Sequence, residues 1–316
     1  METDSFTHIA VMQAEAIAAL DVQTDPGRVY VDGTGGGGTH SRLILDRLDP
    51  SSRLIIIDRD IDAIEHLNRR FAGIDNVTIV NDVFFNFDDI MDRCGVDRVD
   101  GCLLDLGLST HQILSDRGFS FRRADRLDMR MSADGDLSAY EVVNSYSFEE
   151  LKRVFYEYGE ERFAPQIARE IVRRRQEKPI ERTDELSSLV EDVIPAKFKR
   201  NRNAATAVFQ SIRIEVNGEL SELPDALNAM VKRLRVNGTL AVITFHSLEA
   251  AVTKRTLSQY TSAKCTCPRE FPRCVCGAKR IAKFTNRSLA PTEAEIHENP
   301  ASRSARIWSI RKIEEI

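Results

Sequence analysis

Between Gly33 and Gly38 the chain has five glycines in six positions, interrupted only by Thr34. The run follows RVYVDG (28–33), an apolar segment that predicts a buried strand, and precedes THSRLILDRL (39–48), whose apolar residues have helical spacing. Glycine is costly in backbone entropy, so such a run indicates that another group approaches the main chain closely. Between a strand and a helix that group is typically a nucleotide-like ligand, and a flexible tight turn is the alternative.

The segments after the glycine run continue to alternate between strand and helix patterns: RLIIIDRD (53–60), IDAIEHLNRRFAG (61–73), VTIVNDVFF (77–85) and VDGCLLDLGLS (99–109). This alternation predicts an α/β fold with a parallel, doubly wound sheet. Ligands of such sheets bind at the carboxyl ends of the strands, where the sequence places Asp32, Asp58 and Asp105. The glycines fit both a dehydrogenase and a methyltransferase pattern, so the run alone leaves the cofactor open.

The composition indicates a globular protein with a sizeable core. The chain has 316 residues, 42% of them hydrophobic, and a formal net charge of -5. This mild acidity argues against nucleic-acid binding through overall charge and leaves room for local basic patches. No apolar run is long enough to span a bilayer, and the start METDSFTHIA has neither the basic nor the apolar region of a signal peptide. We therefore expect a cytoplasmic protein.

Longer motifs extend along nearly the whole chain. They are HIAVMQAEAIAAL (8–20), DGTGGGGTHSRLIL (32–45), DGCLLDLGLSTHQ (100–112), RGFSF (117–121), LDMRM (127–131), YGEERFAPQIAR (158–169), FQSIRIEVNGEL (209–220), VITFHSLE (242–249) and ENPASRSARIW (298–308). Together they resemble the bacterial ribosomal RNA small subunit methyltransferase H family. The resemblance implies a Rossmann-like class I methyltransferase sheet and S-adenosylmethionine as cofactor. It also implies methylation of the N4 amino group of a cytidine in the decoding region of 16S rRNA, within the small ribosomal subunit.

Matched residue by residue, the resemblance implies a cofactor site made of Gly38, Thr39, His40, Asp58, Phe84, Asp105 and Gln112. Asp58 would bind the ribose, which agrees with its position about 20 residues after the glycine run. The family usually has an aromatic residue at Gly35, an arginine at Gly37 and a glycine at Thr39, so this loop is barer than expected. Three of these assignments have a structural alternative. Asp58 could be only a polar strand end, Phe84 could be a core aromatic, and His40 could bind only through its backbone N–H.

Chemistry also assigns roles to two residues of the predicted cleft. A cytosine amino nitrogen is a poor nucleophile, because its lone pair is delocalised into the ring. An acceptor for one of its N–H groups would turn the lone pair toward the methyl carbon. We predict Asp105 in this catalytic role, through its side chain or nearby main-chain carbonyls; capping the turn after its strand is the alternative. His246 follows the strand TLAVITF (239–245) and could accept a proton or position the base; holding the 245–249 turn is the alternative. The transfer relieves the charge of a sulfonium, so we predict no metal.

The segment between the fourth strand and the second half of the sheet predicts a helical insertion. We assign residues 1–109 and 207–316 to the cofactor-binding core and 110–206 to this insertion, which the resemblance implies binds RNA. Its basic clusters are RRR (173–175), KFKRNRN (197–203) and RGFSFRRADRLDMRM (117–131). Each cluster could contact RNA or form a solvated charged face, and the aromatic residues of the third could also pack over the cofactor pocket.

The last part of the chain has four clustered cysteines, Cys265, Cys267, Cys274 and Cys276. They could bind zinc or remain reduced thiols, since their spacing differs from that of usual structural zinc sites. Two antiparallel strands, RIAKFT (280–285) and ARIWSIRKI (305–313), are expected to close the sheet. Two other functions remain as alternatives to the methyltransferase: a dehydrogenase, and a non-catalytic RNA- or ribosome-binding relative. The sequence does not indicate the oligomeric state.

Overall fold

A computed structural model describes residues 10–121, 123–132, 135–198, 205–263, 267, 276 and 279–316. The chain forms two compact units, one made of residues 1–107 and 220–316 and the other of residues 108–219. Among the described residues, no helix has the length and apolar character needed to cross a bilayer.

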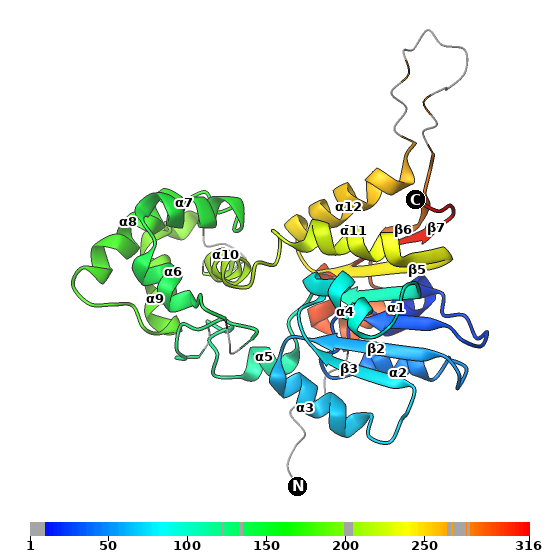
Figure 1. The fold of residues 1–316 in the computed structure, drawn as a ribbon. Helices are drawn as coiled ribbons and strands as arrows, with labels where there is room; N and C mark the ends of the chain where they lie inside the picture. Colours follow the sequence, from blue (N-terminus) through cyan, green and yellow to red (C-terminus); the bar gives the residue numbers. More distant parts are fainter. Residues whose placement is uncertain are drawn as a thin grey trace. The chain divides into compact units, whose positions relative to one another are not determined.

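The first unit is built on a seven-stranded sheet with the order β3-β2-β1-β4-β5-β7-β6 (Figure 1). Its strands are β1 (Val29–Asp32), β2 (Arg53–Asp58), β3 (Val77–Asn81), β4 (Val99–Asp105), β5 (Leu234–Thr244), β6 (Ala282–Leu289) and β7 (Arg306–Lys312). Strands β1 to β5 pair in parallel, whereas β7 is antiparallel to both β5 and β6. The predicted doubly wound α/β sheet and its two closing antiparallel strands are therefore confirmed.

Alternate residues of the central strands pack into two apolar clusters. On β2, Ile55 and Ile57 belong to one cluster and Leu54 and Ile56 to the other, as expected when successive side chains point to opposite faces. The helices of this unit are α1 (Gln13–Leu20), α2 (Thr39–Leu45), α3 (Ile61–Arg70), α4 (Phe87–Arg93), α11 (Leu223–Arg233), α12 (Ser247–Thr261) and α13 (Glu293–Glu298). Residues of α1, α2 and α3 join one cluster and residues of α4, α11 and α12 the other, so both faces are covered.

The helical unit has an apolar core of its own. It contains α5 (Thr110–Leu114), α6 (Ala139–Ser145), α7 (Phe148–Glu157), α8 (Ala164–Arg175), α9 (Thr183–Val193), the short helix η2 (Ala196–Phe198) and α10 (Thr206–Asn217). Leu151, Phe155, Ile167 and Leu186 are buried in that core. Phe119 and Phe121 pack against the same core, so these two aromatics of the third basic cluster serve the fold.

The second predicted domain boundary, between residues 206 and 207, is wrong. Helix α10 belongs to the helical unit, which ends at Glu219. The physical reason is that Val208, Phe209 and Ile212 are buried in the core of this unit. The sequence pattern of α10 indicates an amphipathic helix and carries no signal for which core it joins. The first boundary lies after residue 107 rather than 109.

Candidate active site

The glycine run forms the connection from β1 to α2, and it is held between two strands. Gly33 N donates to Leu103 O (2.9 Å) and Gly35 N donates to Ile57 O (2.8 Å). A Cβ added at Gly33 would overlap the Leu104 side chain, and one at Gly35 would lie 2.6 Å from a methyl group of Ile56. At Gly33 and Gly35, the group that lies close to the main chain is therefore the protein's own sheet and not a ligand.

Two later glycines of the run have left-handed backbone geometry. Gly36 has φ +49° and Gly38 has φ +75°, a region that favours glycine. Gly38 immediately precedes α2, whose first residues are Thr39, half-exposed, and the buried His40. A Cβ at Gly36 would have only the Thr34 carbonyl within 4 Å, so the main chain is accessible there. The run thus combines glycines that the sheet requires with a main-chain segment that a ligand can approach.

Asp58 ends β2 and is tied to the glycine loop. Its Oδ2 accepts a hydrogen bond from Gly36 N (2.7 Å), and its Oδ1 accepts one from Asp60 N (2.8 Å). Burial raises the pKa of the Asp58 carboxyl to about 6, against the effect of these two hydrogen bonds. Each oxygen retains acceptor capacity, so the carboxylate can still bind a pair of hydroxyl groups.

Asp105 ends β4 and is held by two other segments. Its backbone N–H donates to Thr34 Oγ1 (2.7 Å), and its Oδ1 accepts from Gly107 N (3.4 Å). His40 Nδ1 lies 3.7 Å from Asp105 Oδ2, while the other ring nitrogen lies 3.2 Å from Val11 O. Burial raises the pKa of the Asp105 carboxyl to about 6; His40 lowers it, and the negative charges of Asp32 and Glu249 raise it further.

Asp32, which ends β1 between these two acids, was predicted at the ligand-binding edge of the sheet but was not assigned a contact with the cofactor. It is buried and accepts hydrogen bonds from Ser41 Oγ (2.6 Å) and Thr34 N (3.2 Å). Burial raises its pKa, and the bond from Ser41 opposes that change. Its position at the end of a buried strand was the available sequence signal. Asp32 raises the pKa of both Asp58 and Asp105, so the three carboxyls interact electrostatically.

The three carboxyls form an acidic site at the carboxyl edge of adjacent strands. Within the described part of the chain, neither lysine nor arginine forms an ion pair with Asp32, Asp58 or Asp105, and His40 is the only basic side chain paired with any of them. Buried carboxyls without a cation are costly to ionise, which is why their pKa values are raised. S-adenosylmethionine carries a positively charged sulfonium and a positively charged ammonium group. A ligand of this kind would supply the positive charge that these carboxyls lack.

Two other predicted cofactor residues have clear local roles. Phe84 was expected in a strand extending to residue 85, but β3 ends at Asn81 and Phe84 lies in the short helix η1 (Phe84–Asn86). Its ring is half-buried and contacts Phe85 edge to face at 4.4 Å. Gln112 lies in the helical unit and caps α5, where its Oε1 accepts from Ser109 N (3.1 Å). Their contacts with the cofactor stay predictions.

His246 caps the start of α12 together with Glu249, a residue to which the sequence assigned no role. His246 Nδ1 accepts from Glu249 N (3.3 Å), and Nε2 lies 2.9 Å from Glu249 Oε1. Glu249 is buried, and its Oε2 accepts from Phe245 N (2.7 Å) and His246 N (3.3 Å). A capping residue followed three positions later by Glu is a sequence signal for this arrangement. Both ring nitrogens of His246 thus face groups of its own turn.

Cys265 and Cys274 lie outside the described residues, so the zinc alternative stays untested. Of the cluster, Cys276 N donates to Cys267 Sγ at 3.3 Å.

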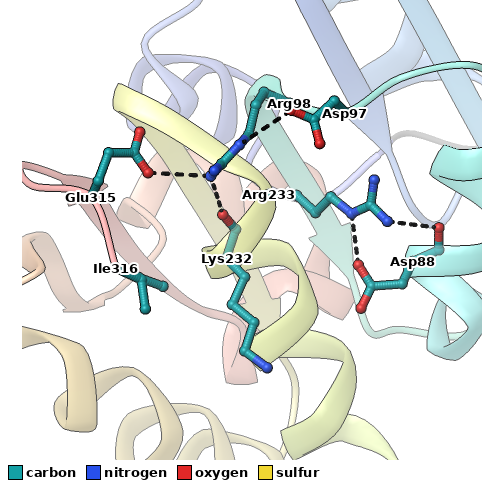
Figure 2. A pocket seen from close by; sticks show the side chains of 7 residues that line it. All are labelled: Asp88, Asp97, Arg98, Lys232, Arg233, Glu315 and Ile316. Carbon is teal, nitrogen blue, oxygen red and sulfur yellow. Dashed lines mark hydrogen bonds and ion pairs between the residues drawn. The ribbon is translucent and has the colours of Figure 1, made fainter.

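A separate pocket lies at the amino ends of β4 and β5, opposite the acidic site. It is lined by Asp88, Asp97, Arg98, Lys232, Arg233, Glu315 and Ile316 (Figure 2). Arg233 Nε donates to Asp88 (2.7 Å), and Arg98 donates to Glu315 (3.2 Å) and to the Lys232 carbonyl (2.7 Å). Because its arginines are engaged by the protein's own acceptors, this pocket is the weaker candidate for a ligand site.

The raised pKa values predict that affinity for S-adenosylmethionine falls as the solution becomes more acidic. Asp58 and Asp105 have pKa values of about 6, so both are mainly ionised at pH 7 and mainly protonated at pH 5. A cationic ligand favours the ionised forms, and each carboxyl should contribute up to about tenfold, or ~100-fold together, between these pH values. Titration calorimetry from pH 5 to 8 measures this change. Asp58→Asn should leave only about tenfold, and a flat wild-type profile would contradict the assignment.

Comparisons with a family model and with individual proteins agree on one family. The model of the MraW methylase family matches residues 5–313. A protein named "Ribosomal RNA small subunit methyltransferase H" from Clostridium botulinum (strain Loch Maree / Type A3) is 45% identical over 98% of this chain and 99% of its own length. One of the same name from Caldicellulosiruptor saccharolyticus is 43% identical over 98% and 100%. A solved structure described as a putative rRNA-methylase from Clostridium thermocellum has 12% identity and a TM-score of 0.45, covering 98% and 99% of the two chains.

Proposed function

The chain belongs to the MraW methylase family, as its motifs predicted, and on that premise we propose its reaction and its substrate. S-adenosylmethionine is the methyl donor, and the family excludes the dehydrogenase alternative. The acceptor in our proposal is the N4 amino group of a cytidine in the decoding region of 16S rRNA in the small ribosomal subunit. The names of the relatives, which are 42% to 45% identical, support rRNA of the small subunit as the substrate.

One observation carries the proposal: three carboxyls gather at the edge of the sheet where the strand order reverses, and among the described residues none of them forms an ion pair with a lysine or arginine. The chain runs outward from β1 through β2 to β3 and then returns to β4 beside β1. Ligands of open α/β sheets bind at such a point. Asp58 would bind the ribose hydroxyls, and the main chain from Gly36 to His40 would bind the methionine part.

Asp105 is the residue we assign to the acceptor nitrogen. When bound, S-adenosylmethionine supplies an electrophilic methyl carbon on a positively charged sulfur. The Asp105 carboxylate accepts a hydrogen bond from one N–H of the cytosine amino group, which turns the nitrogen lone pair toward the methyl carbon. The same carboxylate takes up the proton that the amino group loses when it gains the methyl group. Thr34 and Gly107 hold Asp105 through its backbone and side chain, and His40 lowers the pKa of its carboxyl, which favours the accepting form. No step requires a metal ion, because the departing sulfur loses its charge.

We propose that His246 acts by positioning the 245–249 turn. To accept a proton, the imidazole would have to leave a cap in which both its nitrogens face Glu249. Asparagine caps helices without an imidazole, so His246→Asn should keep methyl-transfer activity within about tenfold of wild type, whereas His246→Ala should lose ~1 kcal/mol of stability. Activity assays and thermal unfolding measure both. A loss of more than ~1000-fold in His246→Asn, with the fold intact, would instead assign the proton to His246.

The proposed function is tested on 16S rRNA from a strain in which the gene is deleted. Mass spectrometry of the digested rRNA should show one cytidine that lacks a methyl group, and nucleoside analysis should identify the missing product as N4-methylcytidine. Complementation with wild type should restore the methyl group, and complementation with Asp105→Asn should not. Restoration by both proteins would remove Asp105 from the mechanism. If the purified wild-type protein binds small subunits but transfers no methyl group to them from S-adenosylmethionine, the result would favour the non-catalytic alternative, in which another enzyme methylates the rRNA. Loss of a methyl group at another atom of the base would overturn the N4 assignment.

A further inference from the structure

The arginines of the 173–175 cluster are engaged within the helical unit. Arg173 donates to Glu170 (2.8 and 3.0 Å) and to Glu177 (3.0 Å). Arg174 pairs with Glu170 (2.7 Å) and Asp192 (2.8 Å), and Arg175 donates to two carbonyls at the end of α6. The charges of Arg173 and Arg174 are therefore largely compensated by carboxylates, and Arg175 is hydrogen-bonded within the unit, so this cluster fits the solvated-face alternative.

A second basic group in the helical unit has a different environment. The guanidinium carbon of Arg162 lies 4.5 Å from the centroid of the Phe198 ring and 5.3 Å from that of Phe163. Lys197 Nζ lies 5.0 Å from the Phe198 centroid. Over the ranges that the structure describes, no carboxylate forms an ion pair with Arg162 or Lys197, in contrast to Arg173 and Arg174.

The Phe198 ring is both exposed and anchored. Its exposed fraction is 41%, which is high for an apolar aromatic side chain. Phe163, which packs against the core of the helical unit, holds Phe198 from one side at a centroid distance of 5.2 Å. The ring therefore stands at the surface beside two cations, an arrangement that suits stacking of a nucleic-acid base next to a phosphate.

We propose that Arg162, Lys197 and Phe198 form a stacking platform that binds an unpaired base of the rRNA substrate and an adjacent phosphate. An aromatic ring and a planar guanidinium both offer a face on which a base stacks, and the two cations complement the phosphate charge. This inference rests on the proposed function, because it takes rRNA as the substrate.

The helical unit also provides matched controls. Tyr156 is more exposed than Phe198, with an exposed fraction of 69%. Within the described residues, no cation contacts the Tyr156 ring. Arg173 is an exposed arginine that is already paired. If any exposed aromatic or any exposed cation could bind RNA, Tyr156→Ala and Arg173→Ala would weaken binding as much as changes in the platform.

The test measures binding of the full-length protein to an unmodified, transcribed fragment of the 16S rRNA decoding region over a range of salt concentrations. Phe198→Ala should weaken binding about 5- to 150-fold and leave the salt dependence unchanged, because it removes stacking and no charge. Arg162→Ala and Lys197→Ala should each reduce the slope of log K against log [salt] by ~0.7. Affinity for S-adenosylmethionine should stay at the wild-type value in all three, and both controls should bind RNA within about twofold of wild type.

The outcomes separate the platform from the proposed function. Phe198→Leu keeps an apolar contact with Phe163 and lacks the π face. It should therefore have a thermal stability between those of wild type and Phe198→Ala, because it loses only the cation–ring contacts, and it should match Phe198→Ala in RNA binding. If wild type methylates the fragment and Phe198→Ala binds it equally well, the platform is wrong and the proposed function stands. If Phe198→Ala binds the fragment normally and small subunits weakly, the surface binds a ribosomal protein instead. If wild type neither binds nor methylates rRNA, the proposed function itself fails.

Discussion

The Asp105→Asn variant is expected to lose about a hundred- to a thousandfold in the rate of methyl transfer at saturating S-adenosylmethionine while it remains folded. Loss of a preorganised group that acts on the reacting atoms typically has an effect of this size. The amide has nearly the shape of the carboxylate, but it offers only one acceptor oxygen and presents an NH₂ group that repels the substrate's N–H. The backbone bond from Asp105 N to Thr34 Oγ1 does not involve the altered group, so β4 and the loop should keep their positions.

The control for this variant is Asp97→Asn. Asp97 lies just before the amino end of β4, and its side chain is 90% exposed. We expect this variant to keep wild-type activity, which would show that charge removal near β4 is not by itself harmful. Single-turnover rates separate the methyl-transfer step from product release, and circular dichroism checks the fold. A single-turnover rate within about threefold of wild type for Asp105→Asn would remove Asp105 from the mechanism.

Much of the fold could be predicted because the central strands β1, β2 and β4 are largely buried and each ends in an aspartate. Asp58 and Asp105 were predictable for this reason, since a buried apolar run followed by a carboxylate specifies the edge of a parallel sheet. The end of β3 was not predictable. The Asp82 carboxylate accepts from Val83 N (2.8 Å) and from the Asn86 side chain (2.8 Å), which turns the chain into the short helix that carries Phe84.

One missed residue of the site, Thr34, depends on a contact between distant segments. The Thr34 hydroxyl group accepts from the backbone N–H of Asp105, 71 residues away in the sequence, and no local pattern specifies this pair. Glu249 was not assigned a role from the sequence; its carboxylate is buried and accepts from two backbone N–H groups of its own turn. Local pattern therefore predicts which strand ends face the ligand, and tertiary packing decides which polar groups hold them in place.

Gly38→Val is expected to reduce affinity for S-adenosylmethionine at least ~100-fold. Gly38 has φ +75°, where a β-branched residue is strained by about 1–3 kcal/mol. A Cβ there would also lie 2.9 Å from Leu67 Cδ2 and 2.9 Å from Phe71 Cε2, and overpacking of this kind costs a further ~1–3 kcal/mol. The loop can relieve both only by moving, which would displace the main-chain segment between Gly36 and α2 that we assign to the methionine part of the cofactor.

Gly73→Val separates backbone strain from displacement of the loop. Gly73 has φ +77°, nearly the same as Gly38, but a Cβ added there would have no atom within 4 Å. Both variants should therefore lose stability through the backbone, and only Gly38→Val should lose cofactor affinity, with Gly73→Val within about twofold of wild type. Titration calorimetry and thermal unfolding on the two proteins measure these quantities. Equal affinities for S-adenosylmethionine in the two variants would mean that the cofactor does not depend on the glycine loop, and the site would have to be sought elsewhere on the sheet.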